Sequence, residues 1–286
     1  MMRRIILWAC LALTAAALPV PAPAGPPAPV TSPAPPPAQI VIAAEDAFPP
    51  WSLPDGRGAA NAIVLAAFKR QGITVDLHTV PYARCRRAVI SGEVAACLSM
   101  GATEDTRRSV LLPAIPLVQA SAALVTAADD RAGSPLTGCT PAGWRGTPVI
   151  GVVNGYEYPP EWDTIARSGR AKLVTVQSET AGLRMLGAGR LDAMALMLDP
   201  LRTLEVLMRQ AGQTFRATPQ CPLGGLPLYV GFNPARQDAA ALIRAFEDGY
   251  HQIESDGTLA AIMAEWEHWA RRAARRGEHR QAGSPP

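Results

Sequence analysis

The sequence predicts an α/β fold of two similar lobes, and three observations lead to this prediction. First, short apolar runs alternate with amphipathic stretches from Ile40 onward, which is the pattern of parallel strands joined by helices. Second, two helical stretches end at a glycine, Gly92 or Gly189, and lead directly into an apolar strand, so one such turn occurs in each lobe. Third, strands near 119–130 and 221–233 leave one lobe and return to it, which creates a hinge of two crossings with a cleft between the lobes.

The individual elements follow from the same periodicities. About 230 folded residues suit two lobes of roughly a hundred residues each. Strands are expected near 40–44, 74–79, 94–98, 148–153, 172–176 and 192–198. Helices are expected at 59–71, 82–91, 159–168, 179–188, 200–211 and 236–252. We expect the first lobe to comprise residues 40–125 and 226–267, and the second lobe residues 126–225.

The N-terminus predicts export. Residues 1–24 combine a basic start at Arg3 and Arg4, an apolar run and a small-residue cleavage site, as in a secretory signal peptide. The apolar run has about 14 residues, whereas a helix that spans a bilayer needs about 20. We therefore expect a soluble periplasmic protein, which begins with an extended, Pro/Ala-rich leader over residues 25–39.

Charge gives no indication of nucleic-acid binding. The formal net charge is +3, of which Arg3 and Arg4 supply two and the segment after Ala270 supplies four, so residues 5–270 carry −3. Residues 268–286 are expected to form a basic, disordered tail.

The cysteines indicate disulfide bonds. Cys10 lies in the signal peptide, which leaves Cys85, Cys97, Cys139 and Cys221 in the exported protein. Their spacing lacks the close Cys-x-x-Cys pairs of a zinc site, so we expect disulfides and no metal. Four cysteines allow three connectivities; we prefer Cys85 with Cys97 and Cys139 with Cys221, because each pair then lies within one lobe.

Six stretches in order resemble one known family. They are AEDAFPPWSLPDG, RAVISGEVAA, GATEDTRRSVLL, VIGVVNGYEY, MLGAGRLDA and ESDGTLAAIMAEW. In this order, behind a signal peptide, they resemble the periplasmic solute-binding proteins of ABC importers, in the two-lobed family with the type II fold that includes the polar amino-acid binders. The resemblance covers nearly all of residues 40–267 and implies a monomer with a small-molecule ligand, the membrane subunits of an ABC permease as partners, and no cofactor.

The first stretch predicts one wall of a ligand cleft. Phe48 and Trp51 follow the first strand, where ligands bind at the mouth between the lobes of such a fold. The neighbouring prolines stiffen the loop and reduce the entropy lost on binding. Asp46 is a candidate to accept hydrogen bonds from a ligand ammonium. The alternatives are that the two aromatic side chains cap the sheet and that Asp46 is a solvated acid.

The stretch SMGATEDTRR predicts a carboxylate site. Amides near Gly101 and Ala102, the Thr103 hydroxyl and the Arg107 guanidinium form a suitable set of donors, since arginine presents paired donors to two carboxylate oxygens. Counted from the strand end, Arg107 falls where the resembling family places its carboxylate-binding arginine. The alternative is a solvated, basic helix start.

The second lobe offers further candidates. Asn154, Gly155 and Tyr156 lie between a strand and a helix start, whose amides favour an anion. Ser178 opens the next helix, either as a ligand contact or as a plain N-cap. Amino-acid binders of the family carry an acid five residues beyond the aspartate matching Asp192, where this chain has Met197. The next acid is Asp199, so an α-amino-acid ligand is in question.

The leading functional hypothesis is a receptor that closes over a small polar or anionic solute, an amino acid or related carboxylate, for ABC-type import. One alternative is an exported enzyme on the same scaffold, such as a cyclohexadienyl-dehydratase-like enzyme; another is a sensory or accessory module. The chain has no Gly-x-Ser-x-Gly and no His-Glu-x-x-His, which argues against the common hydrolases. Acid catalysis by Glu45 or Asp46 stays possible, and a burial-raised carboxyl pKa would be its sign.

Overall fold

The computed structural model describes residues 36–127 and 134–275 of the 286-residue chain, all within one compact unit. The predicted signal peptide, most of the predicted leader and residues 276–286 lie outside these ranges. The strands are β1 (Gln39–Glu45), β2 (Thr74–Val80), β3 (Ala96–Gly101), β4 (Val118–Ala127), β5 (Val149–Val153), β6 (Lys172–Val176), β7 (Ala193–Leu198) and β8 (Ala217–Phe232). The helices are α1 (Ala59–Arg70), α2 (Tyr82–Ser91), α3 (Glu104–Ser109), α4 (Glu161–Arg167), α5 (Glu179–Gly187), α6 (Leu204–Gln210), α7 (Ala239–Ser255) and α8 (Thr258–Arg275), with a 3-10 turn at Pro141–Gly143.

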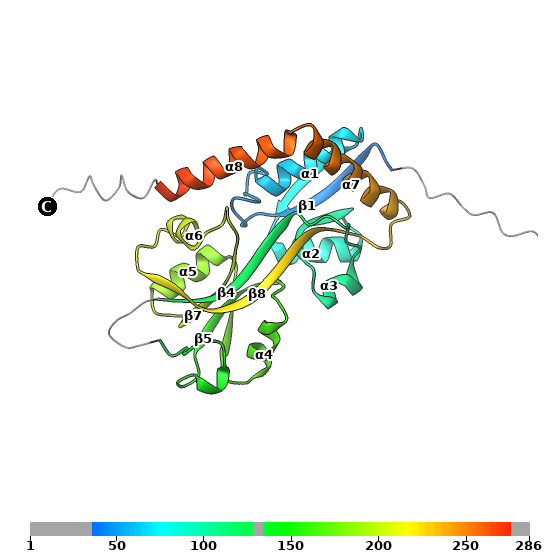
Figure 1. Cartoon of the computed structure of the whole chain (residues 1–286). Helices are drawn as coiled ribbons and strands as arrows, with labels where there is room; N and C mark the ends of the chain where they lie inside the picture. Colours follow the sequence, from blue (N-terminus) through cyan, green and yellow to red (C-terminus); the bar gives the residue numbers. More distant parts are fainter. Residues whose placement is uncertain (1–35, 128–133, 276–286) are drawn as a thin grey trace, which may run out of the picture. The chain divides into compact units, whose positions relative to one another are not determined.

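The described strands form one sheet in the order β2-β1-β3-β8-β4-β7-β5-β6 (Figure 1). β1 pairs in parallel with β2 and β3, and β5 pairs in parallel with β6 and β7. These two parallel groups are the sheets of a first and a second lobe. The prediction of an α/β chain with two lobes is therefore confirmed.

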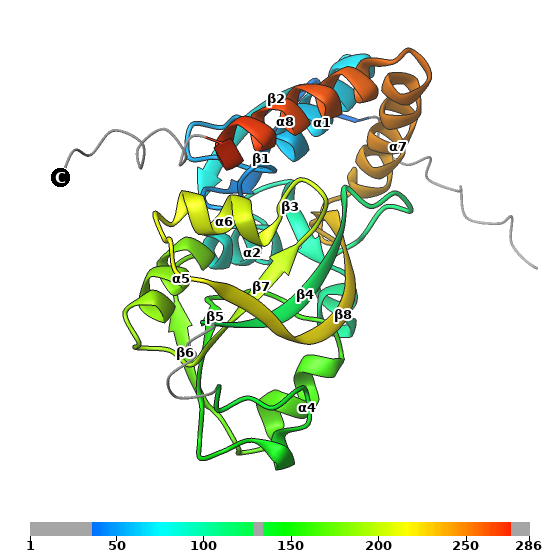
Figure 2. The same ribbon diagram turned by 60° about the vertical axis from the view of Figure 1, so that its left-hand side comes forward.

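The long strands β4 and β8 join the two lobes, as Figure 2 shows from a second side. β8 is antiparallel to β3 at one end and to β4 along most of its length, and Leu228 faces Gly101 of β3 as well as Val118 of β4. The predicted pair of crossing strands is thus confirmed. The exact lobe limits at 125/126 and 225/226 stay a prediction; Ser121–Val125 already pairs with β7 of the second lobe.

Most elements lie where the sequence predicts them, with ends that differ by a few residues. The two helix-to-strand turns agree in backbone conformation, since Gly92 has φ 89° and Gly189 has φ 67°, values that glycine adopts without steric cost. Two features differ from expectation. α3 forms where only a helix start had been considered, and α8 continues to Arg275. The prediction of a disordered tail from residue 268 is therefore wrong for residues 268–275, which extend the amphipathic helix.

The two preferred disulfides are both present. Cys85 on the inner face of α2 is bonded to Cys97 of β3, with Cα atoms 5.6 Å apart, and Cys139 is bonded to Cys221 of β8, with Cα atoms 4.9 Å apart. Both separations fall within the range that disulfides need. Each bridge therefore fastens a helix or loop to a strand of the sheet.

The helices pack on the faces of the sheet and bury its apolar side chains. α1 lies against α7 and α8, while α8 also runs beside α6 of the second lobe (Figures 1 and 2). Trp266 of α8 is 5% exposed and belongs to the largest buried apolar cluster. No helix within the described ranges is long and apolar enough to cross a membrane.

Candidate functional site

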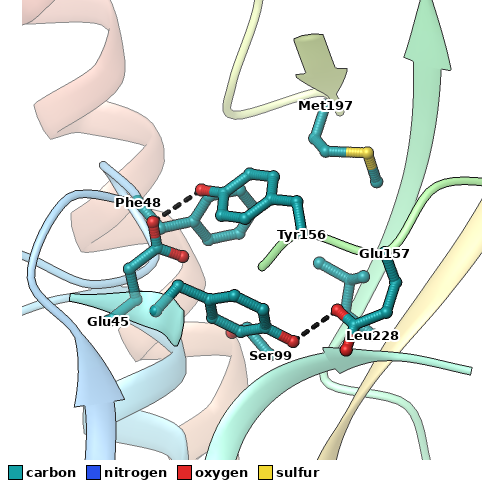
Figure 3. Close-up of a pocket in the computed structure, with 8 residues that line it drawn as sticks. Glu45, Phe48, Ser99, Tyr156, Glu157, Met197 and Leu228 are labelled. Atoms are coloured by element: carbon teal, nitrogen blue, oxygen red, sulfur yellow. Dashed lines mark hydrogen bonds between the residues drawn. The ribbon is translucent and has the colours of Figure 1, made fainter. Parts of the chain in front are cut away.

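A small cavity lies where loops leave the carboxyl ends of parallel strands in both lobes, which is the usual place for a ligand in an open α/β sheet. Its walls combine acidic, aromatic and apolar side chains (Figure 3). The lining residues are Glu45, Phe48, Tyr82, Ser99, Tyr156, Glu157, Met197 and Leu228.

Protein side chains occupy most of the space between these walls. The room left is about what one water molecule requires. The Tyr156 hydroxyl of the second lobe donates to Glu45 Oε1 of the first at 2.6 Å. In the opposite direction, the Tyr82 hydroxyl of the first lobe donates to Glu157 Oε2 of the second at 2.5 Å. Both hydrogen bonds cross between the lobes, so the structure represents a closed arrangement.

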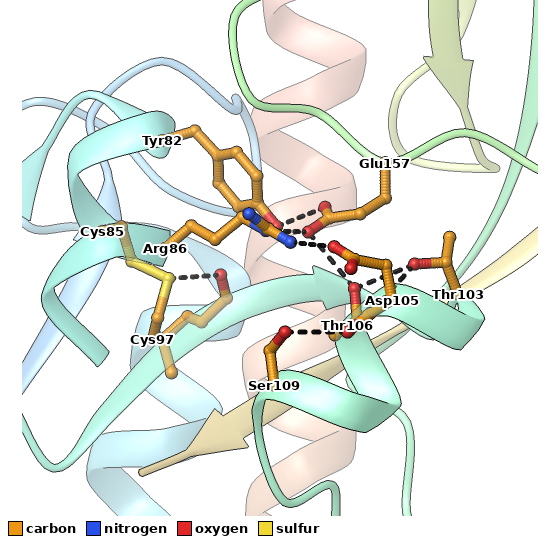
Figure 4. Close-up of polar contacts among 10 residues, drawn as sticks. Tyr82, Cys85, Arg86, Cys97, Thr103, Asp105, Thr106, Ser109 and Glu157 are labelled. Atoms are coloured by element: carbon orange, nitrogen blue, oxygen red, sulfur yellow. Dashed lines mark hydrogen bonds and ion pairs between the residues drawn. A yellow bond between two sulfur atoms is a disulfide. The ribbon is translucent and has the colours of Figure 1, made fainter. Parts of the chain in front are cut away.

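Glu157 is the centre of a polar network that is drawn in Figure 4. Besides Tyr82, it accepts a hydrogen bond from Arg86 Nε at 3.0 Å and from Thr106 Oγ1 at 3.4 Å. Arg86 also pairs through Nη2 with Asp105 Oδ2 at 2.5 Å. The Glu157 side chain is only 9% exposed, and burial raises the pKa of its carboxyl although Tyr82 and Arg86 oppose the shift.

Glu45, unlike Glu157, has no ion-pair partner within contact among the described residues. It is 3% exposed, and burial raises the pKa of its carboxyl from 4.5 to about 8, against the lowering effects of the Tyr156 hydrogen bond and of Arg202. At neutral pH Glu45 therefore retains its proton in most molecules.

A second contact between the lobes lies beside the cavity, and we call it the seam. It consists of Phe48, Pro49 and Trp51 from the first lobe and Asp199 and Arg202 from the second. Trp51 Nε1 donates to Asp199 Oδ2 at 2.7 Å, and Arg202 Nε donates to the Pro49 carbonyl at 3.0 Å. The Arg202 guanidinium carbon lies 4.4 Å from the centre of the Phe48 ring, within the range of a cation–π contact.

Arg202 also anchors the seam within the second lobe. Its guanidinium pairs with Glu179 and donates to the Met197 carbonyl, while Glu179 Oε1 accepts from the Met197 amide at 2.6 Å. Arg202 is fully buried and Glu179 is 1% exposed. Burial lowers the pKa of Arg202 to about 10, so the guanidinium remains charged at neutral pH.

Four of the predicted site residues take part in these contacts. Phe48 and Tyr156 line the cavity, and Trp51 and Asp199 meet in the seam. Gly155 lies at the same interface, because a Cβ added there would come within 2.9 Å of the Ala83 side chain in α2. Gly101 likewise leaves room for Glu157, whose Cβ would lie 2.9 Å from a Cβ at position 101.

The predicted carboxylate site is not assembled in this structure. Arg107 is exposed, and its neighbour Thr106 turns inward and is fully buried. Thr103 caps α3, since its hydroxyl accepts from the Thr106 amide, and the Ala102 amide is already bonded to the Pro227 carbonyl. The six-residue helix α3 decides this outcome, because it turns the residue before Arg107 toward the cleft.

The remaining candidates have local roles. Ser178 is the N-cap of α5, where its hydroxyl accepts from the Ala181 amide, which was the alternative interpretation. Asn154 is exposed, and its amide bonds to the Val176 carbonyl. Asp46 is half-buried at the end of β1 and does not line the cavity.

Sequence reasoning missed several residues of the site. Glu157 stands between Tyr156 and Tyr158 in the stretch VIGVVNGYEY, and an acid between two aromatic residues after a strand is a usable signal. Arg202 is a lone basic residue in the apolar segment LDPLRTLEVL, which indicates a buried partner such as Glu179. Ser99 lies within an apolar strand, between Leu98 and Met100, and carries no sequence signal of its own. Among the described residues, no group of three or more metal-ligating side chains is arranged to hold a metal ion.

A comparison with known protein families shows to which family the chain belongs. Residues 40–268 match the family of bacterial extracellular solute-binding proteins, family 3. The match covers most of the sequence, and the protein therefore belongs to this family. The resemblance carried by the six sequence stretches is confirmed. No match was found among curated protein sequences.

Solved structures show the same fold. An ancestral arginine-binding protein bound to arginine has a TM-score of 0.65 at 18% identity, over 80% of this chain and 98% of that chain. The substrate binding protein of an amino acid ABC transporter has a TM-score of 0.63 at 15% identity, over 80% of this chain and 98% of that chain. The ancestral amino acid-binding protein AncCDT-1, a precursor of cyclohexadienyl dehydratase, has a TM-score of 0.62 at 15% identity, over 80% of this chain and 95% of that chain.

Proposed function

We propose that the protein is an exported solute receptor that traps a small polar solute between its two lobes and delivers it to the membrane subunits of an ABC-type permease. The observation that carries this proposal is a cavity whose walls come from both lobes. Membership of an extracellular solute-binding family supports it, and so does the fold shared with the substrate binding protein of an amino acid ABC transporter. Opening at β4 and β8 would separate the walls and admit a solute.

A thermal-shift screen tests solute binding directly. The purified protein is mixed with amino acids, organic acids, sugars and polyamines, and its melting temperature is followed as a function of concentration. A solute that binds the folded form at about a hundred times its Kd stabilises it by about 2.7 kcal/mol. If no solute raises the melting temperature, the receptor proposal is contradicted.

Two glycine variants test whether closure of the lobes is needed. Gly155 has φ 83° and faces Ala83 of the other lobe, whereas Gly189 has φ 67° and has no atom within 4 Å of an added Cβ. Both Gly155→Ala and Gly189→Ala strain the backbone, but only the first also holds the lobes apart. We expect Gly155→Ala to weaken solute binding and Gly189→Ala to leave it unchanged; equal affinities would argue against binding by closure.

Export and oligomeric state complete the proposal. If residues 1–24 are a cleaved signal, the mass of the protein recovered from the periplasm will correspond to a chain that begins at residue 25. Sedimentation is expected to give the mass of a monomer. An uncleaved protein in the cytoplasm would contradict the assignment to the periplasm, and a change in uptake of the identified solute on deletion of the gene would test coupling to a permease.

A second function has one specific observation in its favour. Burial raises the pKa of Glu45 to about 8, so this carboxyl can act as a general acid at neutral pH. Glu45 would donate its proton to a leaving hydroxyl group, which departs as water, while the ring carboxylate leaves as CO2 and its bonding electrons make the ring aromatic. The test is incubation with a cyclohexadienyl carboxylic acid while the absorbance of an aromatic product is followed. Product that forms with wild type and not with Glu45→Gln would favour the enzyme over the receptor.

A further inference from the structure

The cavity contains acidic groups and no basic group. Of its lining residues, Glu45 and Glu157 are acidic, and none is lysine, arginine or histidine. The nearby arginines are already engaged, since Arg86 pairs with Glu157 and Asp105, and Arg202 pairs with Glu179. Thus no guanidinium in the cavity wall is available to a ligand carboxylate.

The wider network around the cavity has more acids than bases. Its buried or partly buried carboxyl groups belong to Glu45, Glu157, Glu179 and Asp199, whereas its guanidinium groups belong to Arg86 and Arg202. Buried carboxylates are unfavourable unless a positive charge or several donors accompany them. A cation that enters the cavity would compensate this excess, while an anion would increase it.

Ser99 provides an independent observation at the same place. It lines the cavity, it is 7% exposed, and its buried hydroxyl has no hydrogen-bond partner. Its φ of 61° lies in the left-handed region, and among the described non-glycine residues it alone adopts a positive φ. Leaving a buried hydroxyl without a hydrogen-bond partner is unfavourable, so the position of Ser99 in the cavity wall indicates a ligand that supplies the missing bond.

The aromatic side chains suit the same kind of ligand. The rings of Tyr82 and Tyr156 meet edge to face with centres 5.2 Å apart, and Phe48 lies 6.3 Å from Tyr156. Aromatic faces attract ammonium and guanidinium groups, more strongly where water is excluded. The two tyrosine hydroxyls now occupy the carboxylates, and a ligand with its own N–H donors can replace them.

We propose that the solute is a small organic cation without a carboxylate, an amine or guanidinium compound whose positive end is held between Glu45 and Glu157 and whose N–H groups reach Ser99. This proposal rests on the receptor function and names its ligand class. It differs from the amino acid or related carboxylate that the sequence had suggested. The exposed position of Arg107 and the presence of Met197 in the cavity wall agree with a ligand that is not an α-amino acid.

Matched pairs of solutes test the ligand class. Agmatine is arginine without its carboxylate, and putrescine is ornithine without its carboxylate, so each pair differs in this group alone. In calorimetric titrations we expect agmatine or putrescine to bind at least about tenfold more tightly than its amino-acid partner. Tighter binding of arginine or ornithine, or binding confined to organic acids or sugars, would overturn the cation proposal and leave the receptor function intact. If no solute of any class binds, both proposals fail.

Two isosteric variants test the residues. Glu45→Gln and Glu157→Gln each remove a carboxyl group that can carry a negative charge beside the ligand, and each keeps an oxygen that accepts from the neighbouring tyrosine. Each is expected to weaken the tighter-binding amine by at least about tenfold, whereas Glu104→Gln, at an exposed position of α3, is expected to have no effect. Melting curves without solute confirm folding. Wild-type affinity in both cavity variants would overturn the proposal.

The same titrations have a pH readout. Glu45 faces Tyr156, Arg202, Asp46 and Glu157, and burial raises the pKa of its carboxyl. Because only the ionised carboxyl attracts a cation, binding of the amine is expected to release protons and to strengthen between pH 6 and pH 8 in wild type. The dependence should be weaker in Glu45→Gln. A pH dependence identical in both proteins would remove Glu45 from the site.

Discussion

The seam and the cavity lie side by side between the lobes, yet they differ in how their polar groups are satisfied. In the seam, the Trp51 N–H is bonded to Asp199, and each guanidinium nitrogen of Arg202 has an acceptor. In the cavity, Glu45 has a tyrosine instead of a cation, and the Ser99 hydroxyl has no partner. Burial alone therefore does not identify a ligand site. A ligand site is indicated instead by polar groups that the protein leaves without a full set of hydrogen-bond or ion-pair partners.

The strongest way to break the seam is to remove the Arg202 guanidinium. Arg202→Met leaves Glu179 buried without its counter-ion, and such changes typically reduce stability by about 3 to 5 kcal/mol. Urea denaturation at pH 7 measures this loss. Adding Glu179→Gln should recover part of it.

A matched control separates burial from charge. Arg167 pairs with Asp163 one helical turn away, but its side chain is 79% exposed. We expect Arg167→Met to change the free energy of unfolding by less than about 1 kcal/mol. Losses of similar size in the two arginine variants would contradict the role assigned to the buried pair.

The contribution of the cavity to the free energy of unfolding should depend on pH in the opposite way to that of an ordinary ion pair. The Glu45 carboxyl has a pKa of about 8 in the folded protein and an ordinary value of 4.5 when unfolded, so the folded state binds the proton more tightly. Its contribution to stability is complete below pH 4.5 and is lost as the pH rises through about 8. Since one pKa unit corresponds to about 1.4 kcal/mol, we expect a loss of a few kcal/mol over this interval.

Glu45→Gln isolates this contribution. Glutamine cannot ionise, and its amide oxygen can accept from Tyr156, so the variant should be more stable than wild type at pH 8 and close to it at pH 5. Denaturant titrations at both pH values give the comparison, with Glu104→Gln as the exposed control. Equal pH dependence of wild type and Glu45→Gln would show that the carboxyl does not retain its proton in the fold.

Sequence periodicity was sufficient to predict the lobes because it reflects packing that each segment carries within itself. β1, β5 and β7 are apolar strands, and the glycine turns at Gly92 and Gly189 require a conformation that other residues resist. The cysteine pairing followed once the lobes were assigned. These features depend on local pattern and chain order, which the sequence contains directly.

The site was only partly predictable from the sequence. It depends on which side chains of short helices face the cleft and on contacts between segments that are far apart in the chain. Phe48 and Tyr156 were predicted from their positions after strands, which place them at the sheet edge, and both line the cavity. Arg107 was expected to face the cleft, whereas Thr106 faces it in the structure. A rotation of α3 by one residue exchanges the two, and no pattern in the sequence indicates this rotation. The Trp51–Asp199 bond spans 148 residues, which explains why each residue was noted and their pairing was not.

A milder substitution in the seam measures the contribution of a single hydrogen bond between the lobes. Trp51→Phe keeps an aromatic ring and removes the N–H that donates to Asp199. Asp199 also accepts from the Leu201 and Arg202 amides, so it is not left unpaired, and we expect a loss of about 1 to 2 kcal/mol. A double-mutant cycle with Asp199→Asn measures the coupling by denaturant titration. Fully additive effects would mean that the bond contributes nothing to closure.

The smallest effect on stability, and the most informative for the cavity, is expected at Ser99. Glycine adopts a φ near 61° without the Cβ penalty but is more flexible when unfolded, and these opposing terms of about 1 kcal/mol should nearly cancel in Ser99→Gly. Ser99→Ala retains the Cβ and removes only the unpaired hydroxyl, so it should not be destabilising either. Against an amine ligand, however, both variants lose the same hydrogen bond, and we expect a similar decrease in affinity of about three- to tenfold. Melting curves without solute and calorimetry with agmatine separate the two properties. A decrease in melting temperature with unchanged affinity would show that the Ser99 hydroxyl stabilises the strand and does not contact the ligand.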